Sequence, residues 1–473
     1  MNIVKTIRAS QTGAQLNSNV HTGGGTDDTA VLQSVLDTAK DGLGLHLIMD
    51  GAALIHGLLL YSNTTVECLN KDCGFYLADQ TNGSLMRNAH LDFTEIQDRN
   101  IRLLGGTYNH NCRNQLHHAP TDIKVIAELD KSVLEGERLS MAFEFFGVEN
   151  LTVQGITIED QRTFGMLVAN WKHVDMADII INLPNRAHAQ NQDGIHFWGP
   201  GQFLSMRNIS GCAGDDFIAL APDEHDQQSS ITDVLIDGVF LNEADQGIRL
   251  LSRASGRLDR VTIRNVTGRY RSFGFYINSW FPAETCGNFG SITFENIDLR
   301  PMEPNYDYRP PLLFQIGGRF ERLAFINVQD HRAEHQRVLF ELSSPFHTRR
   351  QDLSRTHIDE MVIDGLSVSQ SDALAVPALQ IDCEIDRLFL RDTTLTYQTA
   401  GQTPFIEVGA NGRVGLLAVS NLIGSGLSTL VSVPHGEIKT AALWDVLLPD
   451  GRAVETGEKG ALAQCHCHNV VEK

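Results

Sequence analysis

Long apolar runs are missing from this chain of 473 residues. No segment approaches the roughly 18 consecutive apolar residues that a membrane-spanning helix requires. The first residues, MNIVKTIRASQTGAQLNSN, also lack the apolar core of a secretory signal. We therefore expect no membrane partner and a cytoplasmic location.

Cysteine is sparse and follows no framework spacing. The eight cysteines are Cys68, Cys73, Cys112, Cys212, Cys286, Cys383, Cys465 and Cys467. This scatter argues against a disulfide-stapled scaffold, so we expect most of them to be reduced core residues. Near the end, Cys465 to His468 reads CHCH, but alternating side chains on a strand point to opposite faces. We therefore assign no metal site.

Positive charge is outnumbered in this sequence. Lys and Arg total 38 against 58 Asp and Glu, which gives a formal net charge of −20. Such a balance disfavours the phosphate backbone of a nucleic acid as the main partner. A local basic patch on an acidic protein can still bind an acidic sugar.

One amphipathic helix is expected near the start of the chain. Between Gly25 and Ala39 the sequence reads GTDDTAVLQSVLDTA, in which Asp27 or Asp28 can cap a helix. The apolar residues Val31, Leu32, Val35 and Leu36 fall at helical spacing. Such a helix can cover the open end of a stack of strands.

Short β-branched runs recur from about residue 100 onward, each followed by Asn, Asp or Gly. The strand starts that we align, at Leu151, Val174, Phe203, Val234 and Val261, advance by 23, 29, 31 and 27 residues. This period is too long for leucine-rich repeats and too rich in strands for helical arrays. It predicts an all-β fold, a single-stranded right-handed parallel β-helix with an N-terminal capping helix.

The expected division of the chain follows from this pattern. We expect residues 1–60 to form the N-terminal cap segment with its helix. Residues 61–436 should form the β-helix, and residues 437–473 a less regular closing segment and tail. β-Helices often associate through their flat sides, so a homo-oligomer is possible.

Three acidic residues stand out between Asn191 and Leu220. Asn191-x-Asp193-Gly194 and Gly214-Asp215-Asp216 lie about one repeat apart, because 22 residues separate Asp193 from Asp215. In stacked coils this spacing brings three carboxylates to one patch of surface. Adjacent aspartates can both reach that patch only at a strand end or turn. Turn chemistry alone explains single Asn, Asp and Gly residues better than three acids one coil apart.

Together with Gly247-Ile248-Arg249, these motifs resemble glycoside hydrolase family 28, the polygalacturonases and their relatives. The segment GTDDTAVLQ also resembles the first helix of pectate-lyase-type β-helices. The resemblance covers about residues 20 to 300 and implies inverting hydrolysis of a glycosidic bond without a cofactor. It assigns Asp215 as general acid, with Asp193 and Asp216 activating water.

Elementary electrostatics supports this division of roles independently. Three neighbouring carboxyls cannot all ionise cheaply, so at least one should have a raised pKa and keep its proton for the leaving oxygen. The other two can orient water on the opposite face of the sugar, across a gap of roughly 6.5–9.5 Å.

The chain departs from the family pattern in two places. Where the family has Gly-His-Gly, this chain has Asp245-Gln246-Gly247. The family's Arg-x-Lys, which binds the substrate carboxylate, corresponds in one register to the segment Gly274 to Asn278, which lacks both basic residues. In a second register Gly247 to Leu251 is the basic strand, with Leu251 in place of the lysine. We prefer the first, because the loop Ala221 to Ser230 accounts for the extra spacing.

The expected partner is an oligosaccharide or polysaccharide. Aromatic rings near the acids could stack on the apolar C–H faces of a sugar, and polar or basic residues could bind its hydroxyl or carboxylate groups. The candidate substrate-binding residues are Asn191, His196, Trp198, Gln246, Arg249, Tyr276, Asn278 and Trp280.

Two other classes of function stay open. A polysaccharide lyase would cleave by β-elimination and needs a strong base, but no lysine occurs between Lys172 and the end of these coils. A non-catalytic carbohydrate-binding β-helix would bind in the same groove without cleaving. Replacing Asp215 by Asn separates these classes, because it abolishes turnover in a hydrolase and changes only affinity in a binding protein.

Overall fold

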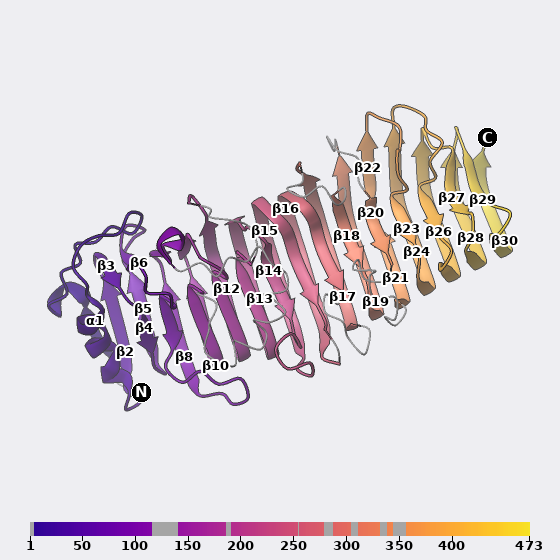
Figure 1. Cartoon of the computed structure of the whole chain (residues 1–473). Helices are drawn as coiled ribbons and strands as arrows, with labels where there is room; N and C mark the ends of the chain where they lie inside the picture. Colours follow the sequence, from indigo (N-terminus) through magenta and orange to yellow (C-terminus); the bar gives the residue numbers. More distant parts are fainter. Residues whose placement is uncertain are drawn as a thin grey trace. The chain divides into compact units, whose positions relative to one another are not determined.

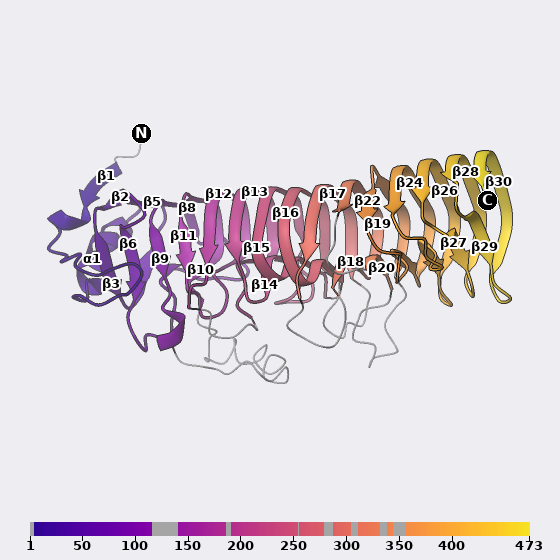
Figure 2. The same cartoon turned by 90° about the horizontal axis from the view of Figure 1, so that it is seen from above.

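The computed structural model describes residues 4–115, 141–185, 191–253, 255–278, 287–303, 311–331, 338–343 and 356–473. The chain divides into two compact units. Unit 1 consists of Met1–Leu220 and Leu235–Ala244, and unit 2 of Ala221–Val234 and Asp245–Lys473. Within each unit the strands stand side by side (Figures 1 and 2).

Unit 1 contains the one α-helix that the described residues form, α1 (Thr29–Leu36), and the short 3-10 helices η1 (Ala9–Gln11), η2 (Asp37–Ala39) and η3 (Cys112–Asn114). Its strands are β1 (Val4–Arg8), β2 (Gly44–Met49), β3 (Ala52–Ile55), β4 (Leu58–Leu60), β5 (Thr64–Cys68), β6 (Gly74–Leu77), β7 (Met86–Asn88), β8 (Asp98–Leu104), β9 (Thr107–Asn109), β10 (Phe143–Gln154), β11 (Thr157–Glu159), β12 (Met166–Asn182), β13 (Ile195–Cys212) and β14 (Asp216–Ala221). β14 ends one residue beyond the unit.

Strand β15 (Ile231–Leu251) contributes residues to both units. The other strands of unit 2 are β16 (Arg257–Asn278), β17 (Asn288–Pro301), β18 (Leu312–Ile316), β19 (Arg319–His331), β20 (Val338–Leu342), β21 (His357–Asp364), β22 (Ser367–Gln370), β23 (Leu379–Ile381), β24 (Glu384–Tyr397), β25 (Ile406–Val408), β26 (Arg413–Ser425), β27 (Thr429–Val433), β28 (Glu437–Leu448), β29 (Arg452–Thr456) and β30 (Ala461–Glu472). Within residues 437–473, β28 pairs with β26 and with β30 in parallel. The expected boundaries at residues 60 and 436 stay predictions.

Parallel pairing between successive coils builds both units. In unit 1, Leu151 of β10 pairs with Val174 of β12, which pairs with Leu204 of β13. In unit 2 one interior column runs through Ile292, Leu323, Met361, Leu388, Leu417 and Ala441. Each of these side chains is buried, so the apolar columns form the core. The predicted right-handed parallel β-helix is confirmed.

The predicted alignment is wrong at Phe203. Val174 pairs with Leu204, and Phe203 lies at a coil corner with φ 66° and 42% of its surface exposed. Its ring stacks on that of His173, with ring centres 4.9 Å apart. Phe203 and Leu204 are neighbours and both apolar, so from the sequence alone either residue could occupy the interior position.

Helix α1 forms within the predicted segment and packs beside the first strands of unit 1 (Figure 2). Leu32, Val35 and Leu36 are buried. Asp27 accepts the backbone N–H of Thr29 at 2.9 Å, whereas the Asp28 carboxylate accepts the N–H groups of Gln15 and Leu16 instead of capping the helix. In the described ranges no helix is long and apolar enough to span a bilayer.

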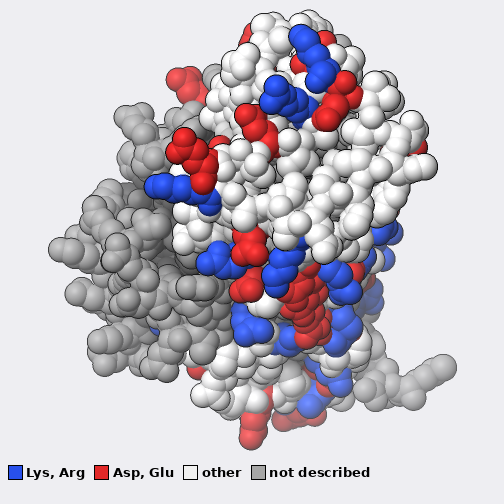
Figure 3. Space-filling view, turned by 90° about the vertical axis from the view of Figure 1, so that its right-hand side faces the viewer, with Lys and Arg blue, Asp and Glu red and all other residues white. Residues whose placement is uncertain are grey.

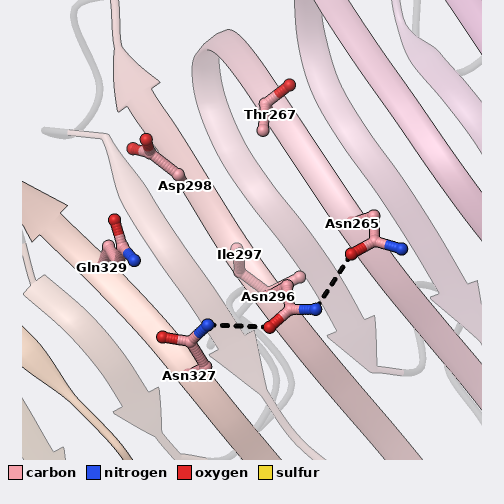
Figure 4. Close-up of a pocket in the computed structure, with 7 residues that line it drawn as sticks. All are labelled: Asn265, Thr267, Asn296, Ile297, Asp298, Asn327 and Gln329. Carbon is pink, nitrogen blue, oxygen red and sulfur yellow. Dashed lines mark hydrogen bonds between the residues drawn. The ribbon is translucent and has the colours of Figure 1, made fainter.

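Asparagine occupies coil corners, as the sequence indicated. Asn265, Asn296 and Asn327 have φ values of 58°, 56° and 55°, a left-handed conformation that Asn tolerates better than most residues. Their amides form a ladder across three coils (Figure 4). Asn296 donates to Asn265 at 2.9 Å, and Asn327 donates to Asn296 at 2.7 Å.

Charged side chains of both signs are interspersed on the face shown in Figure 3. In unit 2, Arg257 pairs with Glu321 at 2.8 Å, and Glu360 pairs with both Arg322 and Arg387 at 3.2 and 3.4 Å. Carboxylates of neighbouring coils therefore neutralise these guanidinium groups locally.

Candidate active site

Asp193 lies just before β13, and its side chain is only 3% exposed. His196 Nδ1 lies 2.8 Å from Asp193 Oδ2. An ionised carboxylate only accepts hydrogen bonds, so Nδ1 carries the proton in this pair. The imidazole is 5% exposed and stacks on the ring of Phe164, with centres 4.6 Å apart. Both contacts fix the orientation of the Asp193 carboxylate.

Asp215 and Asp216 lie where β13 ends and β14 begins, and both are half-buried. Asp215 Oδ2 accepts the backbone N–H of Asn191 at 2.9 Å. The Asp216 carbonyl accepts the N–H of Gly194 at 2.8 Å. The segment from Asn191 to Gly194 therefore lies directly beside the two aspartates on the next coil. The predicted separation of one coil is what the structure shows.

Glycine at two positions allows these coils to approach. A Cβ on Gly194 would lie 2.3 Å from the Phe217 carbonyl oxygen, and one on Gly165 would lie 2.7 Å from the Gly194 oxygen. Gly165 N–H donates to the Asp193 carbonyl at 2.9 Å. Three successive coils thus place their backbones in close contact around Asp193.

Two buried amides that the sequence analysis missed support the same loop. Gln161 Nε2 donates to the Asp193 carbonyl at 3.1 Å, and Gln192 Nε2 donates to the Gln161 carbonyl at 2.8 Å. Both glutamines are fully buried. Gln192 lies inside the motif from Asn191 to Gly194, so its position in the sequence could have indicated a role in the site. Nothing in the sequence around Gln161 or Phe164 indicated such a role.

The other candidates of unit 1 take different positions. The contact of Asn191 with Asp215 is made by its backbone N–H. Trp198 is 6% exposed, and its carbonyl accepts the indole N–H of Trp171 at 3.0 Å. The Trp198 ring lies edge-on to His196 with centres 6.2 Å apart. Contact of Asn191, His196 or Trp198 with a sugar stays a prediction.

The remaining candidates belong to unit 2. Gln246 is half-buried. Arg249 stacks on Tyr276, its guanidinium carbon lying 3.7 Å from the ring centre. Asn278 is fully buried, and its Nδ2 donates to Gln315 at 2.5 Å. Trp280 lies outside the described residues. Contact of these side chains with a sugar stays a prediction.

One group of side chains in unit 2 has the composition of a metal site. Among the described residues, His357, Asp359 and Asp386 bring potential metal ligands within 4.8 Å of one another. The distances from His357 Nε2 to the two carboxylates, 3.7 and 3.3 Å, fit ordinary surface ion pairs. We assign no metal to this group.

The described cysteines are free thiols. Cys68, Cys73, Cys112 and Cys383 are buried as expected, and Cys212 is half-buried. Cys465 and Cys467 are exposed and do not belong to the core, while Cys286 lies outside the described residues.

The central part of the chain is similar to known proteins. Residues 127–306 match the model of glycosyl hydrolases family 28. A polygalacturonase from Medicago sativa is 25% identical over 181 residues, which cover 37% of this chain. The chain spans only 40% of the length of that curated relative.

Solved structures share the fold at low sequence identity. The tailspike protein of E. coli bacteriophage HK620, solved with a pentasaccharide, is 12% identical with a TM-score of 0.60, covering 91% of this chain and 75% of its own. The N-terminal fragment of bacteriophage Phi29 gene product 12 is 12% identical with a TM-score of 0.52, covering 97% of this chain and 72% of its own. The resemblance predicted from the motifs is confirmed: residues 127–306 are similar to glycoside hydrolase family 28, and the chain resembles a polygalacturonase.

Proposed function

We propose that the protein is a glycoside hydrolase that cleaves a pectin-like oligosaccharide or polysaccharide with inversion at the anomeric carbon. The observation that carries the proposal is the backbone pairing that sets Asp193 beside Asp215 and Asp216. The family match includes all three positions, and a polygalacturonase is among the relatives.

Asp215 is the general acid in this proposal. It stands in the bend before β14, half-buried, where a carboxyl can reach the glycosidic oxygen of a bound sugar. Protonation of that oxygen lets the leaving sugar depart as a neutral alcohol. Replacing Asp215 by Asn removes the transferable proton while keeping nearly the same shape.

Asp193 and Asp216 hold and activate the attacking water. The His196 N–H that donates to Asp193 favours the ionised carboxylate, since it stabilises the charged form. A charged carboxylate can accept a proton from water as the oxygen attacks the anomeric carbon from the opposite face. The bond to the leaving oxygen breaks as the new bond to water forms, which inverts the configuration.

Kinetics of three single variants test these roles. Asp193→Asn, Asp215→Asn and Asp216→Asn should each lower kcat by roughly 10²–10⁴-fold on an oligosaccharide that the wild type cleaves. Asp175→Asn is the matched control, because Asp175 is a half-exposed aspartate of β12 paired with Arg207. Full activity in Asp215→Asn contradicts the assignment of the general acid.

A further inference from the structure

Strand β30 of unit 2 carries two thiols on one face. Cys465 and Cys467 are two residues apart in the strand, so their side chains point to the same side. Their sulfurs lie 3.5 Å apart, well beyond the roughly 2.05 Å of a disulfide bond, and both thiols are free and exposed. The side chains of His466 and His468 alternate with them and point to the opposite face. The two thiols therefore form a pair without the histidines.

Apolar packing does not explain why these two positions hold cysteine. Where β30 pairs with β28, Cys465 lies beside Ala441 and Cys467 lies beside Leu443. Ala441 and Leu443 are fully buried, and in such a position a thiol would serve as a small apolar side chain. On β30 the two thiols are exposed instead. Their chemistry toward soft ligands is then the property that distinguishes them from other small side chains.

The spacing of the two sulfurs suits a single thiophilic metal ion. A metal–thiolate bond is about 2.3 Å long, so one ion can contact two sulfurs that lie up to about 4.6 Å apart. The observed separation of 3.5 Å is inside that limit, so rotation of the side chains is enough to place an ion between them. The formal net charge of −20 also attracts cations to the protein.

The number of ligands selects the kind of ion. In the described ranges, the one group that brings three potential ligands within 4.8 Å of one another is that of His357, so no third such ligand joins the two sulfurs. Zinc prefers four ligands, and Mg²⁺ and Ca²⁺ prefer oxygen. Soft thiolates select monovalent copper, which forms stable complexes with two of them.

We propose that Cys465 and Cys467 bind one monovalent copper ion, Cu(I), through both sulfurs. Each thiol gives up its proton to solvent, two copper–sulfur bonds form, and the pair gains one net negative charge. No electron is transferred, because the metal binds as Cu(I). The inference goes beyond the proposed hydrolysis and does not depend on it.

Competition for Cu(I) without oxygen measures this site. Cu(I) is added to the full chain with ascorbate as the reductant and bicinchoninate as the coloured competing chelator. The wild type should withdraw one equivalent of Cu(I) per chain that the double variant Cys465→Ser/Cys467→Ser leaves with the chelator. Each single variant should bind that ion more than about 100-fold more weakly, because loss of a residue behind a metal ligand already costs roughly 10–100-fold. Cys212→Ser, at a single half-buried thiol, is the matched control and should keep the full uptake.

Conservative variants separate metal binding from a structural role. Cys465→Met/Cys467→Met keeps two soft sulfur atoms and should retain part of the Cu(I) affinity that the serine variant loses. The melting temperature of the metal-free serine variant should equal that of the wild type, because both side chains are exposed. Cu(I) should raise the melting temperature of the wild type and not that of the serine variant.

Equal uptake of Cu(I) by the wild type and the double serine variant overturns the proposal. A native mass spectrum in which one copper ion is shared between two chains overturns it as well. Hydrolysis of an oligosaccharide should be the same in the wild type and the double serine variant. If neither protein hydrolyses any oligosaccharide but only the wild type binds Cu(I), the proposed function fails and this inference stands.

Discussion

His196 and Asp193 form a buried pair, with Nδ1 of the imidazole 2.8 Å from Oδ2 of the carboxylate. The pair can form because Asp193 lies in the irregular segment before β13, where the alternation of side chains along a strand does not apply. His196 acts on the reaction through Asp193, so it is a positioning residue.

Replacing His196 by Gln should lower kcat by about tenfold with little change in KM, because a hydrogen bond to a charged group is lost. The pH profile should change as well, since the carboxylate of Asp193 loses the donor that stabilises its ionised form. His173→Gln, at an exposed histidine of the same unit, is the control. A pH profile identical to that of the wild type would show that His196 only fills space.

Gly194→Ala should disturb both stability and activity. The added methyl would lie 2.3 Å from the Phe217 oxygen and 2.7 Å from Ile181 Cδ1, so the coils around Asp193 must separate. Overpacking of this kind costs about 1–3 kcal/mol. Gly83→Ala is the control, because the nearest atom to its Cβ is 3.9 Å away. Thermal unfolding monitored by circular dichroism measures the stability of the two variants. Equal melting temperatures for Gly194→Ala and Gly83→Ala would contradict the close approach of the coils.

Buried His110 should make unit 1 less stable in acid. Burial lowers its pKa to about 4, while its Nε2 donates to the Gly83 carbonyl at 2.9 Å and its Nδ1 accepts the N–H of Arg162 at 3.0 Å. In the unfolded chain the pKa is about 6.5. Between pH 6.5 and 4 the imidazole of His110 is therefore protonated in the unfolded chain but stays neutral in the folded protein. The free energy of unfolding falls as pH falls through this range.

The effect is roughly 3 kcal/mol over that interval. Nearby Asp160 has a pKa raised by burial and acts in the opposite direction, so the comparison has to be made between wild type and His110→Gln. Denaturant titrations from pH 7 to pH 4 should show a smaller loss of stability in the variant. Parallel curves for the two proteins would refute the role of His110.

The sequence predicted the parts of this protein that depend on local pattern and spacing. The helix between Gly25 and Ala39, the asparagine corners and the one-coil separation of Asp193 from Asp215 all follow from periodicity and turn chemistry. Phe203 was misplaced by one residue because two adjacent apolar side chains give no local reason to prefer either. The contact of the buried Gln161 amide with the Asp193 carbonyl could not be predicted, because contacts between coils join residues whose neighbours only the folded chain defines.

The products of cleavage test the central claim most directly. Wild type and Asp215→Asn should be incubated with acidic and neutral oligosaccharides in isotopically labelled water and the products weighed by mass spectrometry. A hydrolase gives products that have gained one labelled water, and these should be lost in the variant. Products with an added double bond, or the same hydrolysis products from Asp215→Asn, would contradict the account.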